Sequence, residues 1–238
     1  MSIRTRIESE GFAIVPQVYQ RAECETAACQ LTDSLSACAD DRTALRRANG
    51  TIYGARSLLD VFPQSAELWR RPPLMELLDA VLGPRYGLVR GLYFDKPPAS
   101  TWSLPWHRDL TIAVRDHSLP SSAFRNPTTK AGVEHLEAPD TVLRQMLTLR
   151  IHLDDATDEN GPLQVIPGTH HSRDAEATRA PATVYALAGD VLAMRPLMIH
   201  SSGASHEGTT MHRRVIHLEF AASEQLPDGF QWQWFLPK

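Results

Sequence analysis

Residues 189–202 read GDVLAMRPLMIHSS, an apolar run that follows a Gly-Asp turn and ends at a histidine. Three more runs resemble strands: TVLRQMLTLRIHLDD at 141–155, PLQVIP at 162–167 and RRVIHLEFAA at 213–222. Turn signals at Asn160-Gly161 and Pro167-Gly168 separate them, and no helical pattern intervenes. Several strands joined by turns favour an antiparallel sandwich or a jelly roll.

The N-terminal third has a different pattern. GLVRGLYFD at 87–95 predicts one more strand, but residues 1–85 predict a mainly helical flank. In that flank we expect a short strand and turn at 11–19 and helices over 21–39 and 74–82. The whole chain, 1–238, is then one domain with its jelly-roll core over 86–221.

A segment without clear periodicity lies inside the predicted core. Residues 110–140 are rich in Pro, Ser, Thr and charge, and a loop of that length in a compact domain is typically a functional lid or a disordered insert. We expect it to cover the substrate with His117, Arg125, Lys130 and His135. Their mixed charge hints at a polar or anionic small molecule.

Composition excludes several classes of protein. The 238 residues carry a formal net charge of −4, and the arginine pairs are scattered, so nucleic acid is not an expected partner. No apolar run is long enough for a membrane span or a signal peptide, so no membrane association is expected. The three cysteines cluster in one predicted helix, which favours a reducing, cytoplasmic location. Oligomeric state stays open.

Candidate metal ligands occur as His-x-acid pairs, in which alternate residues of a strand can face one ion. The chain has four such pairs, and spacing does not choose among them: His107/Asp109, His152/Asp154, His135/Glu137 and His217/Glu219. Context favours His107 and Asp109, which follow a proline turn at the mouth of the long loop. His200, at the end of the apolar run, is the candidate distal ligand. Two histidines and one carboxylate suit non-haem Fe(II).

An arginine pair follows at the start of the last predicted strand. Arg213 and Arg214 are adjacent, so they face opposite sides and one of them points inward. A buried arginine could pair with the carboxylate of a bound cosubstrate, because its fork matches a carboxylate in two hydrogen bonds. Two solvated charges are the ordinary alternative.

In order, WHRD, NGPLQVIPGTH, GDVLAMRPLMIHSS and RRVIHLEFA resemble the phytanoyl-CoA dioxygenase (PhyH) family of Fe(II)/2-oxoglutarate-dependent oxygenases. GFAIVPQVY and FDKPP also match, so the resemblance covers roughly residues 10–221. It implies a mainly β fold with flanking helices, a double-stranded β-helix (jelly roll, cupin-like). It implies iron at His107, Asp109 and His200, the distal carboxylate of 2-oxoglutarate at Arg213, and an assisting hydroxyl at Ser202. O2 is then the oxidant, with ascorbate as a candidate reductant.

One strand allows two interpretations. In QMLTLRIHLDD, Thr148, Arg150 and His152 alternate with apolar residues, so one face is polar. The strand is either half exposed or lines the active-site cavity, where Arg150 and Thr148 would contact cosubstrate or an anionic substrate.

The resulting hypothesis is an oxidoreductase, a dioxygenase that hydroxylates a small-molecule metabolite with release of succinate and CO2. The intact carboxylate at Asp109 disfavours halogenation. Desaturation, epimerisation or cyclisation would use the same cofactors. A non-oxidative metal-binding cupin-like protein, or a zinc hydrolase or isomerase, is the alternative from another class.

Overall fold

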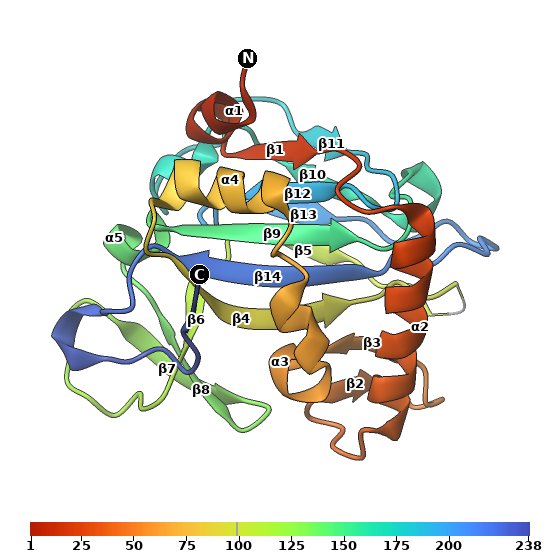
Figure 1. Cartoon of the computed structure of the whole chain (residues 1–238), viewed down its shortest axis with the longest axis horizontal. Helices are drawn as coiled ribbons and strands as arrows, with labels where there is room; N and C mark the ends of the chain where they lie inside the picture. The colour runs from red at the N-terminus through yellow and green to blue at the C-terminus, as the bar shows by residue number, and fades with distance from the viewer. Residues whose placement is uncertain (99) are drawn as a thin grey trace.

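Two antiparallel sheets face each other, and a third, smaller sheet lies beside them (Figure 1). The computed structural model describes residues 1–98 and 100–238. The main sheet has the order β1-β12-β9-β14-β4-β3-β2, with β15 also paired to β4. Its strands are β1 (Phe12–Val15), β12 (Val191–Met194), β9 (Met146–His152), β14 (Val215–Ala221), β4 (Gly87–Phe94), β3 (Ile52–Ala55), β2 (Ala44–Arg46) and β15 (Leu236–Pro237).

The second sheet has four strands in the order β11-β10-β13-β5. Its strands are β11 (Ala182–Val184), β10 (Leu163–Val165), β13 (His200–Ser202) and β5 (Leu104–His107). Leu192 and Met194 of the main sheet form a core cluster with Leu163, Val165 and Met198, so the two sheets pack face to face at this end. The predicted jelly-roll fold is confirmed, and its sheets do not close into a barrel.

Helices cover the outer face of the main sheet (Figure 1). They are α1 (Ile3–Glu10), α2 (Arg21–Ala37), α3 (Leu58–Val61) and α4 (Pro72–Leu82), with a 3₁₀ turn η1 (Pro63–Glu67); α5 (Asp140–Leu143) and the turns η2 (Asp158–Asn160), η3 (Thr169–His171) and η4 (Pro227–Gly229) lie in the connections. α4 begins with Pro72 in its first turn and ends at Gly83, whose φ of 82° suits glycine. The helices predicted over 21–39 and 74–82 are therefore confirmed. The same N-terminal segment also supplies β1, β2 and β3 of the main sheet.

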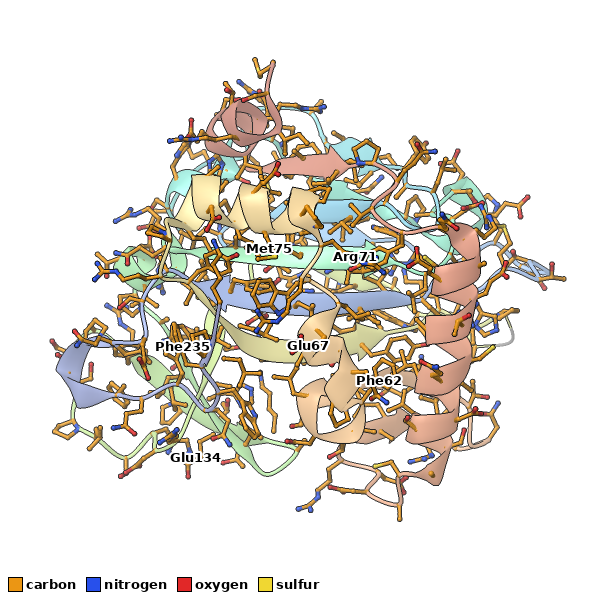
Figure 2. All side chains as sticks on the ribbon, viewed as in Figure 1. Phe62, Glu67, Arg71, Met75, Glu134 and Phe235 are labelled. Carbon is orange, nitrogen blue, oxygen red and sulfur yellow. The ribbon has the colours of Figure 1, made fainter. Side chains whose placement is uncertain are left out.

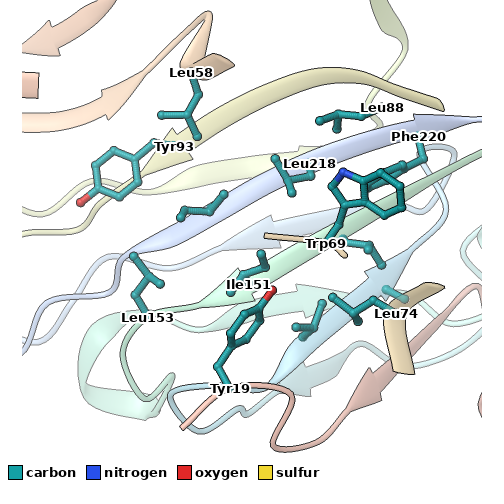
Figure 3. Packing of buried hydrophobic residues seen from close by; sticks show 14 of the residues in the cluster. Tyr19, Leu58, Trp69, Leu74, Leu88, Tyr93, Ile151, Leu153, Leu218 and Phe220 are labelled. Carbon is teal, nitrogen blue, oxygen red and sulfur yellow. The ribbon is translucent and has the colours of Figure 1, made fainter. Parts of the chain in front are cut away.

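The core between these helices and the sheet explains the alternation in β9. Leu147, Leu149 and Ile151 point to the helical side and are fully buried there. Trp69 meets Phe220 of β14 edge to face, with ring centroids 5.4 Å apart (Figure 3). In Figure 2 the segment that carries Phe62, Glu67, Arg71 and Met75 crosses the front of this sheet. The apolar residues of β9 thus face the helices, which leaves its polar residues to the space between the sheets.

The segment 110–140 is not a structureless loop, so this prediction was wrong. It forms an antiparallel sheet of the order β6-β8-β7, made of β6 (Thr111–Val114), β8 (Val133–Glu137) and β7 (Arg125–Lys130). Figure 1 shows this sheet at the lower left of the molecule. β7 is exposed along nearly its whole length, so its sequence RNPTTK is polar and lacks the alternation of a half-buried strand.

Within the described ranges, no helix combines the length and the apolar character that a membrane crossing would require.

Candidate metal centre

Two paired strands bring the candidate ligands together. β5 and β13 run antiparallel, and His107 lies directly opposite His200 in their register. Asp109 follows two residues after His107. Its Oδ1 lies 3.7 Å from His107 Nε2, and its Oδ2 lies 3.6 Å from His200 Nε2. All three ligand atoms lie within 4.8 Å of one another, which suits a single shared ion.

Both imidazoles are oriented by backbone carbonyls. His107 Nδ1 lies 2.8 Å from the carbonyl oxygen of Pro105, and His200 Nδ1 lies 3.0 Å from that of Met198. A neutral ring that donates through Nδ1 presents the lone pair of Nε2, the state a metal binds. Burial lowers the pKa of His200 to about 4, so this ring is neutral at physiological pH.

Asp109 supplies the negative ligand. Burial opposes its charged form, but His200, His217, His107 and Arg90 nearby outweigh burial and hold its pKa below the usual range. Its Oδ2 is buried without a hydrogen-bond partner in the described part of the chain. A buried carboxylate oxygen that nothing satisfies is costly, and a cation would satisfy it. Two imidazoles and one carboxylate form the donor set typical of non-haem Fe(II).

In each competing pair the acid faces an arginine. Asp154 binds Arg214 at 2.6 Å, Glu219 accepts from Arg90 Nε at 2.8 Å, and Glu137 lies 4.0 Å from Arg173. Among the described residues, the trio at His107 is the one group of His, Cys, Asp or Glu side chains whose ligand atoms cluster closely enough to share an ion. The structure thus brings together the three residues that context favoured.

Five buried polar side chains gather where β9 meets the segments before β14 and after β4, and we call this cluster the chamber: Thr148, Arg150, His152, Arg213 and Lys96. Arg213 is only 2% exposed, and its guanidinium makes no hydrogen bond or ion pair among the described residues. Burial, with Arg150 nearby, lowers the pKa of Arg213 to about 9. A buried cation without an anion is unfavourable. Arg213 therefore fits the distal carboxylate of 2-oxoglutarate.

Arg214 shows the opposite behaviour. Its guanidinium is partly exposed and makes two hydrogen bonds to Asp154, at 2.8 and 2.6 Å. The two arginines thus face opposite sides of the chain, as the sequence predicted. The inward residue is Arg213.

The polar face of β9 lies inside the molecule, so the half-exposed interpretation was wrong. Every residue of β9 is buried. Thr148 Oγ1, Arg150 Nε and both ring nitrogens of His152 have no hydrogen-bond partner among the described residues. Arg150 lowers the pKa of both His200 and Arg213, so it lies near the trio as well as near Arg213. Orphaned polar atoms in such number suit a chamber built around a polar ligand.

Lys96, the third cation of the chamber, was not predicted from the sequence as a site residue. Lys96 is fully buried, and its Nζ donates to Ser202 Oγ at 3.0 Å and to the Gly161 carbonyl at 3.2 Å. Burial, with Arg213 and Arg150 nearby, lowers its pKa to about 7. Lys96 also holds Ser202, the hydroxyl that the family resemblance singled out. The only local signal was its position in FDKPP, directly after a strand.

Comparison with known proteins decides the family. The family model described as Phytanoyl-CoA dioxygenase (PhyH) matches residues 7–214. The chain belongs to the phytanoyl-CoA dioxygenase family. The predicted family is thus confirmed. The chain combines the family of the iron- and 2-oxoglutarate-dependent oxygenases with a candidate iron site at His107, Asp109 and His200.

Individual relatives agree with this family. L-proline trans-4-hydroxylase of Streptomyces griseoviridis is 34% identical over 137 residues, which cover 58% of this chain and 43% of that relative. The crystal structure of AviO1 from Streptomyces viridochromogenes has a TM-score of 0.66 and 25% identity, covering 94% of this chain and 96% of that one. The epimerase SnoN, solved with Fe3+, alpha ketoglutarate and nogalamycin RO, has a TM-score of 0.64 and 17% identity, covering 95% and 86%. At that identity SnoN shows the fold alone.

In this phytanoyl-CoA dioxygenase family member, a buried chain of hydrogen-bonded polar groups, which we call the wall, runs from Arg150 in the chamber to Arg90. Arg150 donates to His217 Nδ1 at 3.1 Å, His217 Nε2 lies 3.1 Å from Glu219 Oε1, and Glu219 accepts from Arg90 Nε at 2.8 Å. Arg90 and Glu219 pair across β4 and β14. Hydrogen bonds link each group to the next, and Glu219 is the acidic partner of Arg90.

At the Arg90 end of the wall lies a cavity of about 190 Å³. Asp109 lines it, together with Arg90, Arg56, Lys130 and His135. Two of the four residues expected to cover the substrate, Lys130 and His135, are therefore at this cavity. Arg125 is exposed on β7, and His117 lies 3.7 Å from Glu134. We call this cavity the outer pocket.

Proposed function

We propose that this protein is an Fe(II)/2-oxoglutarate-dependent dioxygenase that hydroxylates a small-molecule metabolite. The observation that carries the proposal is the combination of the His107/Asp109/His200 trio with the unpaired, buried Arg213. A metal site alone would suit many functions. A buried cation that forms no ion pair among the described residues calls for an anionic cosubstrate.

The proposed roles follow from the donor atoms. His107 Nε2, His200 Nε2 and the Asp109 carboxylate would hold iron, as in the two-histidine, one-carboxylate sites of non-haem iron enzymes. Iron with 2-oxoglutarate and O2 supplies the oxidising chemistry, in which 2-oxoglutarate becomes succinate and CO2 and a substrate C–H becomes C–OH. Arg213 binds the distal carboxylate of 2-oxoglutarate through its guanidinium.

Other chamber residues have supporting roles in this proposal. Thr148 Oγ1 and Arg150, whose Nε has no partner in the described structure, contact the bound cosubstrate. The Ser202 hydroxyl, held by Lys96 at 3.0 Å, assists Arg213. Because the chamber is buried, it keeps water from the reacting atoms, which strengthens each of these charge interactions.

Desaturation, epimerisation or cyclisation would use the same residues. The shared fold with the epimerase SnoN keeps epimerisation as the second candidate. A non-oxidative metal-binding protein, or a zinc hydrolase, gives no reason for the unpaired Arg213.

An anaerobic titration tests the proposal. Protein with Fe(II) and 2-oxoglutarate should develop the weak visible charge-transfer band of the chelated metal, and air should then bleach it. A band that is absent from protein with one bound Fe(II) would contradict the proposal. For turnover, succinate release is followed with small metabolites. L-Proline and other free amino acids come first, because the hydroxylase relative acts on L-proline.

We also propose a cytoplasmic location. Cys24, Cys29 and Cys38 are all free thiols, which fits a reducing compartment.

A further inference from the structure

The outer pocket has a charge that the proposed cofactors do not explain. Three basic side chains line it, from three different parts of the chain: Arg56 before α3, Arg90 on β4 and Lys130 at the end of β7. Asp109 is the acidic residue among its described lining residues, and it belongs to the candidate metal centre.

The three cations are not equivalent. Arg90 is neutralised by Glu219, its partner across the sheet. Arg56 and Lys130 are half-buried, and neither makes an ion pair within residues 1–98 and 100–238. Burial lowers the pKa of Lys130, and Arg90 and Arg56 lower it further, so these charges lie close together. Two like charges in a half-buried pocket repel, and a bound anion would remove that penalty.

The dimensions of the outer pocket limit the ligand. Its volume of about 190 Å³ lies below the roughly 300–1,000 Å³ of pockets that enclose drug-sized molecules. Leu59 and Val89 add apolar surface, and Trp234 lies in the lining with 37% of its surface exposed. The pocket therefore suits a compact molecule with one charged end and an apolar portion directed toward the metal ligand Asp109.

We infer that Arg56 and Lys130 form the binding site for an oxyanion of the primary substrate, which is a small acid. The inference rests on the proposed function, because it treats the outer pocket as the substrate side of that metal centre. An arginine fork and a lysine ammonium both bind carboxylate and phosphate oxygens. Both groups are oxyanions, and the experiment distinguishes a carboxylate ligand from a phosphate ligand.

The test uses matched compounds with the whole protein loaded with Fe(II) and 2-oxoglutarate. Two carboxylate pairs are L-proline with L-prolinamide and L-leucine with L-leucinamide; the phosphate pair is glycerol 3-phosphate with glycerol. The readouts are the change in the charge-transfer band under nitrogen and succinate release in air. We expect the compound that perturbs the band to be an acid, and its neutral counterpart to bind about 10- to 100-fold more weakly, as for the loss of one charged contact.

Variants assign the effect to the two cations. Arg56→Gln and Lys130→Gln should each raise the KM of the active acid about 10-fold or more, with kcat changed far less. Lys130→Arg should restore most of the affinity. Arg125→Gln, on the same strand β7 but exposed, is the matched control and should leave KM unchanged.

The outcomes separate the two proposals. A missing charge-transfer band in iron-loaded protein would contradict the proposed function itself. If the band is normal but no acid in the panel binds more tightly than its neutral counterpart, only the proposed oxyanion site is contradicted. The same conclusion follows if both glutamine variants bind the active compound as tightly as the unchanged protein. A response to the phosphate pair alone would support the site and assign it to phosphate.

Discussion

The chamber and the outer pocket are both cationic, but they differ in how completely they are shut off from water. Arg213 and Lys96 in the chamber are fully buried, whereas Arg56 and Lys130 in the outer pocket are half-buried. The loss of hydration therefore costs the cations of the chamber more free energy than it costs the cations of the outer pocket. A fully buried cation depends strongly on an anionic partner, a role that the proposed cosubstrate would fill anew in each catalytic cycle. A half-buried cation tolerates an empty site, which suits the binding of a substrate from solvent.

The largest effect should come from the centre that the two regions share. His107→Ala removes one of the three proposed metal ligands and should abolish stoichiometric iron binding and activity. His152→Ala, inside the chamber but outside the trio, should keep most of the iron. Iron content after anaerobic loading and desalting measures both variants, and equal losses would mean that the wrong His-x-acid pair was chosen.

Breaking the Arg90–Glu219 ion pair of the wall should lower the free energy of unfolding. Glu219→Gln leaves Arg90 buried without a negative partner, and breaking a buried ion pair typically costs about 3–5 kcal/mol. We expect a lower urea midpoint with an unchanged slope. Arg4→Gln, which breaks an exposed helical pair with Glu8, is the control and should cost well under about 1 kcal/mol. Equal midpoints for the two variants would show that the wall is not a structural element.

The arginine pair tests the chamber alone. Arg213→Gln should raise the KM for 2-oxoglutarate about 10- to 100-fold, because a charged double hydrogen bond is lost. Arg214→Gln should leave that KM nearly unchanged and weaken only the bond to Asp154. Initial rates at varied 2-oxoglutarate give both values. The reverse order would overturn the assignment of Arg213 to the cosubstrate.

Acid should destabilise the fold through a buried histidine in each region, His152 in the chamber and His135 in the outer pocket. Burial lowers the pKa of His152 to about 3 and that of His135 to about 4, from an ordinary value near 6.5. Below pH 6.5 the unfolded chain therefore binds protons that the folded chain does not, so stability falls as pH falls. Between pH 7 and 5, His152 alone should account for about 2 kcal/mol.

Urea midpoints across this pH range measure the effect. His152→Gln should flatten the pH dependence at least as much as His135→Gln, since His152 is the more deeply buried ring. A steeper dependence in His152→Gln would mean that this histidine is protonated in the folded chamber.

The site residues that could be predicted from the sequence are those that lie in recognisable motifs in a fixed order along the chain. His107, Asp109, His200 and the pair at Arg213 stand in a fixed order along the chain, so motifs identified them. The alternation in β9 gave its polar face, although not which side was buried. Helices cover one face of β9 and the second sheet lies over the other, an arrangement that the alternation alone does not reveal.

The residues of the outer pocket could not be found in this way. Arg56 follows β3 in an ordinary turn, and its approach to Lys130 depends on how the sheet β6-β8-β7 meets the main sheet. The polar, exposed β7 gave no strand signal at all. Sites assembled from distant segments leave no spacing for a sequence to display.

The position of Arg213 just before β14 has a consequence for how this chain can change in length. Residues 203–212, between β13 and β14, are largely exposed, so insertions there should be tolerated. One residue inserted between Arg214 and Val215 would exchange the facing of the two arginines or shift His217 and Glu219 off the inner face. Length variation among related chains should therefore accumulate before Arg213 and stop abruptly after it.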